Sequence, residues 1–164
     1  MKTTNQSNLQ KKEKRILPYL YGGGIVLVFL LGLYAVKGFF PFGDESMAVM
    51  DMCHGYIPIY YHLYDFLHGD KALFFDFYSG TGVNMVGIAA ANGLLSPLNL
   101  LFYLTPRDSL VDFLNLLLLV KAVGMALSAQ FFFLKRFPRL AVEYATAFSV
   151  LYALSGYVLL YYLH

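Results

Sequence analysis

Charged residues are scarce in this chain of 164 residues. They make up 13% of the sequence, whereas hydrophobic residues make up 59%. A soluble domain contains about 25% charged and roughly 45–50% apolar residues, so this composition is that of a membrane protein. The chain also has a single cysteine, Cys53, which excludes a scaffold held by internal disulfides. With a net charge of only +2, nothing indicates a nucleic-acid partner.

The hydrophobic residues are concentrated in three long runs, at residues 16–36, 110–134 and 140–163. Each run is long enough to cross a bilayer core of about 30 Å as a helix. A signal peptide is the alternative for the first run. However, the run exceeds a typical signal core, and no small-x-small cleavage motif follows Val36. We therefore predict an all-α fold, a polytopic α-helical membrane protein with three transmembrane helices.

Three consecutive glycines, Gly22, Gly23 and Gly24, lie near the start of the first run. Glycine permits close contact with a neighbouring helix, and it also permits a local bend. The sequence alone does not decide between these two roles.

Charges are segregated along the chain. The tail 1–15 carries five basic residues and one acid, and the link 135–139 carries three basic residues. The segment 37–109 between them carries seven acids. By the positive-inside rule, the N-terminus and the 135–139 link are predicted to be cytoplasmic and the acidic segment extracytoplasmic. We thus expect a multi-pass protein of the cell membrane.

The third apolar run ends at Leu163, and His164 is the last residue. Three helices alone leave one face of a bundle uncovered. We therefore expect an N-terminal piece of a larger polytopic protein in preference to a chain that completes itself by oligomerisation.

A helical projection of residues 46–68 predicts an amphipathic helix in the extracytoplasmic segment. Its narrow polar face carries Asp51, His54, His62 and Asp65. Helices that lie on anionic lipid usually carry basic residues on this face, but none occurs here before Lys71. The face is therefore better suited to a cleft. Pro58 cannot donate a hydrogen bond to the carbonyl of His54, so we expect a kink there.

The following segment, 79–104, is apolar but interrupted by glycines and by Pro97. Irregular backbone at membrane depth must be buried in protein or line a cavity. We expect a re-entrant or interfacial segment with short helices. The alternative, a fourth span over 83–104, would place the 135–139 link outside and break the charge pattern.

Two carboxylates, Asp44 and Asp51, are candidates for a general base or a metal ligand. Asp44 precedes the predicted helix, so an N-cap is an equal alternative for it. Asp51 lies inside the helix, where aspartate has poor propensity, and a role in a site is favoured. The pairs Asp51/His54 and His62/Asp65 are about 16 Å apart on a straight helix, too far for one ion. We predict no metal site and no cofactor, with a divalent metal as the minority alternative.

The candidates for substrate binding are His54, Tyr56, His62, Asn84 and Lys121. A lysine in the middle of an apolar span is costly, so Lys121 contacts either a substrate or a carboxylate on another helix. Gly80-Thr81-Gly82 lacks the residues of a phosphate-binding loop, which leaves a turn in which Asn84 bonds to backbone or ligand. Tyr56 either stacks on a sugar or belongs to an interfacial aromatic belt.

The residues from Pro41 to Pro106 resemble the N-terminal region of the YfhO family of bacterial membrane proteins, which looks like part of the C-type glycosyltransferase superfamily. The resemblance is carried by the Gly43-Asp44 turn, Asp51…Tyr56-x-Pro58, Ser79-Gly80-x-Gly82-x-Asn84 and Ser96-Pro97-x-Asn99. One departure is Gly55, where we expect glutamine, and it weakens a substrate contact at that position.

The resemblance implies transfer of a sugar from a polyprenyl-phosphate donor to a cell-envelope glycopolymer, such as teichoic acid, or to a lipid on the outer face. Asp51 would be the base, with Asp44 as second choice. Because family members are several times longer, this chain alone is expected to be inactive. A transporter or flippase of lipid-linked sugars and a non-catalytic membrane partner remain as alternatives.

Overall fold

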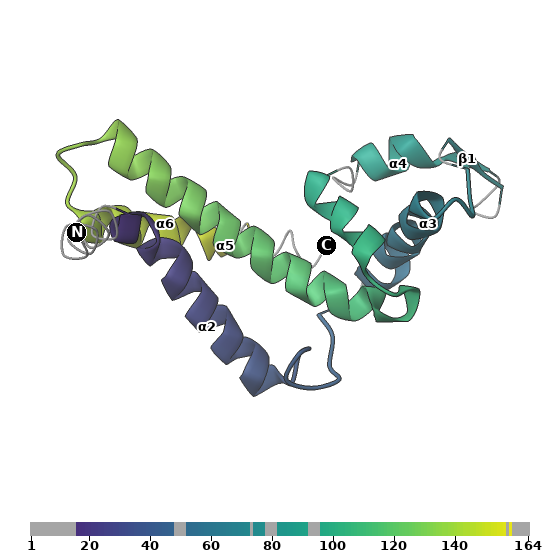
Figure 1. The fold of residues 1–164 in the computed structure, drawn as a ribbon, viewed down its shortest axis with the longest axis horizontal. Helices are drawn as coiled ribbons and strands as arrows, with labels where there is room; N and C mark the ends of the chain where they lie inside the picture. The colour runs from purple at the N-terminus through teal and green to yellow at the C-terminus, as the bar shows by residue number, and fades with distance from the viewer. Residues whose placement is uncertain are drawn as a thin grey trace, which may run out of the picture. The chain divides into compact units, whose positions relative to one another are not determined.

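The computed structural model describes residues 16–47, 52–72, 74–77, 82–91, 96–156 and 158. These residues are mostly helical and fall into two compact units (Figure 1). The first unit contains residues 16–37 and those from 118 onward, and the second contains residues 38–117. The long helix α5, Leu110–Arg136, contributes its first eight residues to the second unit and the remainder to the first.

The first unit is built from apolar helices. A 3-10 turn at Leu17–Tyr19 leads into α2, Tyr21–Lys37, and the unit also contains α5 from Leu118 onward and α6, Val142–Ala153. Lys135 and Arg136 lie in the last turn of α5, where cations offset the helix dipole. The helix ends before Phe137, because a residue that precedes proline is disfavoured in helical conformation.

One helix of the described residues, Arg107–Arg136 with its preceding 3-10 turn, is long and apolar enough to cross a membrane. It corresponds to the predicted span 110–134. The helix α2 lies within the predicted first span but has 17 residues, a little short of a crossing. The predicted third span, 140–163, contains α6, which ends at Ala153 before the turn at Leu154 and Ser155. The number of crossings and their orientation stay predictions.

The three glycines of α2 separate into two kinds. Gly22 and Gly23 are buried, whereas Gly24 is exposed. A Cβ atom on Gly22 would lie 2.9 Å from Oε1 of Gln130, and one on Gly23 would lie 2.5 Å from Cδ2 of Leu127. Both neighbours belong to α5. Close helix contact, and not a bend, is therefore what Gly22 and Gly23 provide.

Gln130 of α5 is hydrogen-bonded to the 3-10 turn before α2 and to α6. Its side chain is fully buried, and its Nε2 donates hydrogen bonds to the carbonyl of Pro18 at 2.9 Å and to Oγ1 of Thr146 at 3.0 Å. Thr146 in turn donates to the carbonyl of Val142 at 2.8 Å. A polar side chain between apolar helices is tolerated where it finds partners on its neighbours.

The second unit contains shorter elements. A π-helical turn at Met52–Tyr56 leads into α3, Ile57–Leu67. The strands β1, Phe75–Asp76, and β2, Val83–Asn84, form an antiparallel pair, and α4, Met85–Ala91, follows directly. Two 3-10 segments, Pro97–Leu104 and Arg107–Ser109, lead into α5. Their apolar core consists of Tyr60, Tyr64, Ala89, Leu110, Leu114 and Leu117.

The predicted helix over 46–68 differs from the structure at its start. Ser46 and Met47 are not helical, and regular α-helix begins only at Ile57. Pro58 explains the π-helical turn, because its ring nitrogen cannot bond to the carbonyl one turn earlier. The irregularity therefore falls on the His54–Gly55 step, as the sequence predicts.

The described parts of segment 79–104 are short helices with a strand before them, which agrees with the short helices expected; an interfacial or re-entrant position stays a prediction. Neither α4, with seven residues, nor the 3-10 segment, with eight, is long enough to cross a bilayer alone. The strand pair is a correction to the all-α prediction. It is only two residues long on each side, and Gly82, with a φ of +99°, lies beside it.

Candidate functional site

Asp44 lies on a closed loop that directly follows α2. The loop is held by two backbone hydrogen bonds, from the N–H of Glu45 to the carbonyl of Gly38 at 3.0 Å and from the N–H of Phe40 to the carbonyl of Glu45 at 3.3 Å. Gly38 adopts a φ of +69°, a left-handed conformation that favours glycine. The Asp44 side chain is exposed on this loop. It is not an N-cap, because Ser46 and Met47 after it are not helical.

Asp51, the first candidate for the base, lies outside the described residues. The neighbouring candidates differ from each other in burial: His54 is exposed on the π-helical turn, whereas Tyr56 is half-buried and packs against the core of the second unit. The predicted polar face is thus divided. His54 is open to a ligand, but His62 and Asp65 on the same face are buried.

His62 joins α3 to β1. Its Nε2 lies 3.0 Å from the carbonyl oxygen of Ala72, which accepts hydrogen bonds only, so this nitrogen carries the proton. Its Nδ1 lies 3.7 Å from Oδ2 of Asp76. Both side chains are buried, with exposed fractions of 5% and 7%. His62 therefore holds the strand against the helix, and this arrangement does not present the imidazole to a substrate.

Asp65 gathers the two basic side chains that the sequence places between Gly38 and Ser109. Arg107 donates to it through Nε at 2.8 Å and through Nη2 at 3.3 Å, and Nζ of Lys71 lies 3.7 Å from Oδ2 (Asp65). The Arg107 guanidinium also lies 4.8 Å from the ring centre of Tyr61. The two partners are 6 and 42 residues from Asp65 along the chain (71 − 65 and 107 − 65). No local pattern in the sequence indicates this cluster.

The pKa of Asp65 lies below its usual value. The hydrogen bond from Arg107 is the main cause, the charges of Arg107 and Lys71 act in the same direction, and burial opposes them. Asp65 is therefore ionised near neutral pH and paired with Arg107 and Lys71. A carboxylate with such a lowered pKa is a weak base.

This lowered pKa predicts acid sensitivity of the second unit. A carboxyl whose pKa is lower in the folded state stabilises the fold above its unfolded pKa of about 3.9, and the contribution is lost as the pH falls through the folded value. We expect the chain in detergent to lose stability as the pH falls below about 4, with the uptake of about one additional proton on unfolding replaced by none once Asp65 is protonated in both states. In Asp65→Asn, stability at neutral pH should be lower and this part of the pH dependence absent. Thermal unfolding followed by circular dichroism at a series of pH values measures both. Asp70→Asn, at an exposed neighbour, serves as the control; an unchanged pH profile in Asp65→Asn would contradict the assignment.

Asn84 caps α4. Its Oδ1 accepts a hydrogen bond from the N–H of Gly87 at 3.1 Å, at the position where helix N-caps bond. Of the two roles left open by the sequence, a bond to backbone is the one that the structure contains. Gly82 beside it passes under the ring of Phe75, where a Cβ atom would lie 2.7 Å from Cζ of that ring. Gly80 and Thr81 lie outside the described residues.

Asn99, the last residue of the Ser96-Pro97-x-Asn99 motif, bonds to Tyr60 in the core of the second unit. Asn99 is only 2% exposed, and it forms this hydrogen bond through its side chain. Burial raises the pKa of Tyr60 to about 12, with the hydrogen bond acting in the opposite direction. Tyr60 therefore stays protonated at physiological pH and is excluded as a base.

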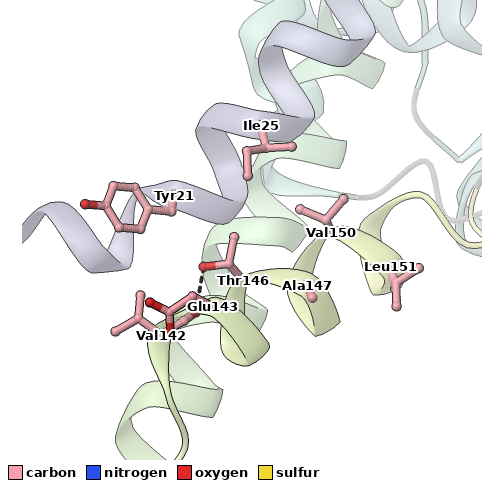
Figure 2. Close-up of a pocket in the computed structure, with 8 residues that line it drawn as sticks. All are labelled: Tyr21, Ile25, Val142, Glu143, Thr146, Ala147, Val150 and Leu151. Atoms are coloured by element: carbon pink, nitrogen blue, oxygen red, sulfur yellow. Dashed lines mark hydrogen bonds between the residues drawn. The ribbon is translucent and has the colours of Figure 1, made fainter.

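Lys121, the remaining binding candidate, is half-buried near the middle of α5. The first unit also contains a groove of about 670 Å³ between α2 and α6 (Figure 2). Its lining is almost entirely apolar and consists of Tyr21, Ile25, Val142, Glu143, Thr146, Ala147, Val150 and Leu151. No residue predicted for the site lines this groove, so it offers no polar active site.

Within the described residues, no three His, Cys, Asp or Glu side chains lie close enough together to bind a metal ion. The cluster of His62, Asp65, Lys71, Asp76 and Arg107 is instead a set of pairwise contacts. Each acid in it is matched with a base. The cluster positions α3, β1 and the start of α5 relative to each other, and leaves Asp44 and His54 as the exposed candidates.

An apolar helix of membrane-crossing length, joined to a compact unit that carries exposed polar residues, is the pattern of a helical membrane protein. The family model described as bacterial membrane protein YfhO matches residues 24–164, and the chain belongs to this family. The resemblance found in the sequence is therefore confirmed. No curated protein matches the chain. No solved structure matches it either.

Proposed function

We propose that this chain is part of a membrane-embedded glycosyltransferase. It would move a sugar from a polyprenyl-phosphate donor to a cell-envelope glycopolymer or lipid on the outer face of the membrane. The observation that carries the proposal is the position of Asp44 in a YfhO-family chain. Its carboxylate is exposed on a closed loop directly after an apolar helix, where a hydroxyl group at the membrane surface has access.

Two other acids of the second unit are engaged, unlike Asp44. Asp65 is held by Arg107 and Lys71, and Asp76 is buried beside His62. A general base must reach the proton that it removes and must be free to accept it. Asp44 meets the first condition, and within the described part of the chain it forms no ion pair. The resemblance still makes Asp51, which lies outside the described residues, the first choice for the base, and the exposed position of Asp44 supports it as the second choice.

In the proposed reaction the carboxylate removes a proton from an acceptor hydroxyl. The oxygen attacks the anomeric carbon of the donor sugar and forms the new glycosidic bond. The bond between this carbon and the phosphate oxygen breaks, and the polyprenyl phosphate leaves with the electron pair. Because attack and departure occur on opposite faces, the anomeric configuration is inverted.

His54 and Tyr56 are the proposed sugar contacts. They follow Asp51 by three and five residues and come from the π-helical turn, which is exposed at His54. Local π-helical geometry is often found at functional sites. For Lys121 we propose a contact within the membrane to a phosphate or to a carboxylate of another helix.

Glycan mass spectrometry of cells that lack the gene tests the proposal. We expect a hexose to be missing from an envelope glycopolymer or glycolipid, and to return when the intact gene is supplied. Membranes of the deleted strain should also contain more of the polyprenyl-phosphate-linked sugar, because its consumption has stopped. An unchanged glycan profile would exclude this function and leave the scaffold role. Accumulation on the cytoplasmic face only, tested by enzymatic access in inverted vesicles, would identify a flippase instead.

A further inference from the structure

Large aromatic side chains are exposed around β1. The exposed fractions are 69% for Phe74, 46% for Phe75 and 79% for Phe77. The rings of Phe75 and Phe77 meet edge to face, with their centres 4.7 Å apart. Soluble monomers rarely expose apolar side chains in such groups, and an exposed cluster marks a surface that another apolar phase covers.

At β1 the acidic side chain is buried and the apolar side chains are exposed, the reverse of what is usual in a sheet of a soluble protein. The side chains of the two β1 residues, Phe75 and Asp76, point to opposite faces, and the ring contact places Phe77 on the side of Phe75. Asp76 is the buried residue of the three, and it faces His62. The acid is therefore inside and the phenylalanines are outside. Because the contact between His62 and Asp76 fixes the inner face, the orientation of the outer face is determined by the fold.

The same unit contains the first turns of α5, the helix that is long enough to cross a membrane. Arg107 precedes this helix by three residues, and Lys71 precedes Phe74 by three residues. Both cations lie within 4 Å of Asp65, and three residues of chain span at most about 10 Å. The exposed phenylalanines are thus tied closely to the start of α5, where the membrane surface is expected.

We propose that Phe74, Phe75 and Phe77 form an interfacial anchor that inserts into the lipid of the outer leaflet. Aromatic rings with neighbouring cations suit this interface, since the rings enter the boundary of the acyl chains and the cations pair with lipid phosphates. The side chains of Lys71 and Arg107 remain 39% and 54% exposed beside Asp65, so they are accessible to such phosphates. The proposal does not depend on sugar transfer.

The chain has no tryptophan, so a single Phe77→Trp substitution gives one fluorescent reporter in the full chain. Because this side chain is exposed, the change does not disturb the core. The protein would be reconstituted in vesicles of phosphatidylcholine and phosphatidylglycerol, with brominated phosphatidylcholine as a quencher that carries its bromines near the headgroup or near the bilayer centre. Phe131→Trp, at an exposed position of α5, is the reference for contact with lipid. Phe74→Trp repeats the measurement at a second position.

We expect blue-shifted emission and a loss of intensity with headgroup-proximal bromines comparable to that of Phe131→Trp, with weak quenching by aqueous acrylamide. Red-shifted emission that acrylamide quenches strongly would show that the patch faces water, and would overturn the proposal. Blue-shifted emission that neither quencher reduces would show that protein covers the patch, and would also overturn it.

Discussion

Replacing Asp51 with asparagine is expected to reduce envelope sugar transfer by roughly 10²–10⁴-fold, the contribution typical of a general base. Asparagine keeps the size and the hydrogen-bonding capacity of the side chain but cannot accept the proton of the acceptor hydroxyl. The measurement is the amount of transferred hexose in a strain that lacks the gene and is complemented with the variant at equal protein level. Asp44→Asn in parallel shows which of the two carboxylates is the base.

Asp70→Asn is the matched control, because it removes one exposed carboxylate from the same segment. It should retain transfer. Full restoration by Asp51→Asn together with loss in Asp44→Asn would move the base to Asp44. Restoration by both variants would contradict the transferase mechanism and favour a transporter, whose polar face needs no proton acceptor.

Gly23→Ala is expected to lower the free energy of unfolding by about 1–3 kcal/mol, the usual cost of overpacking. The new methyl group would lie 2.5 Å from Cδ2 and 2.6 Å from Cγ of Leu127, so either Leu127 changes rotamer or α2 moves away from α5. Reversible unfolding in mixed micelles of dodecyl sulfate and a mild detergent measures the change.

Gly24→Ala is the control at the adjacent position. No atom lies within 4 Å of a Cβ built on Gly24, and the residue is exposed within the same helix. Alanine there should be neutral or should stabilise the chain by roughly 0.5–1 kcal/mol, because it lowers the entropy of the unfolded state. An equal loss of stability in the two variants would show that helix propensity, and not contact with Leu127, controls this region.

The helices of the first unit could be predicted from the sequence because their signal is local. Residues 110–134 form a long, mainly apolar run without proline, and the structure contains α5 at Leu110–Arg136. The disturbance before Pro58 follows in the same way from the missing N–H of proline. The roles of Gly22, Gly23 and Gly24 could not be predicted from the sequence, because they depend on which face of α2 meets α5.

The contacts of His62 and Asp65 in the second unit could not be predicted from the sequence for a related reason. A helical projection places His62 and Asp65 on one face with Asp51 and His54, but it cannot show that Arg107, Lys71 and Asp76 cover one end of that face. Those partners lie beyond the end of the helix, and Arg107 is 42 residues from Asp65 (107 − 65). The result is that His62, a predicted substrate contact, holds β1, and Asn84, another, caps α4. The substrate roles of the remaining candidates stay predictions.

The ion pair between Asp65 and Arg107 has a consequence for how this family can vary. It joins the two ends of a 42-residue stretch (107 − 65), so that α5 begins at a fixed place relative to α3 whatever the chain does in between. The entropic cost of closing such a loop rises by only about 0.6 kcal/mol for each doubling of its length. The length of the chain between these two residues therefore adds little to the cost of holding α5 beside α3. The elements within the stretch are held by contacts of their own, at Asp76, Ala89 and Asn99, so changes in length are accommodated best in its exposed connections.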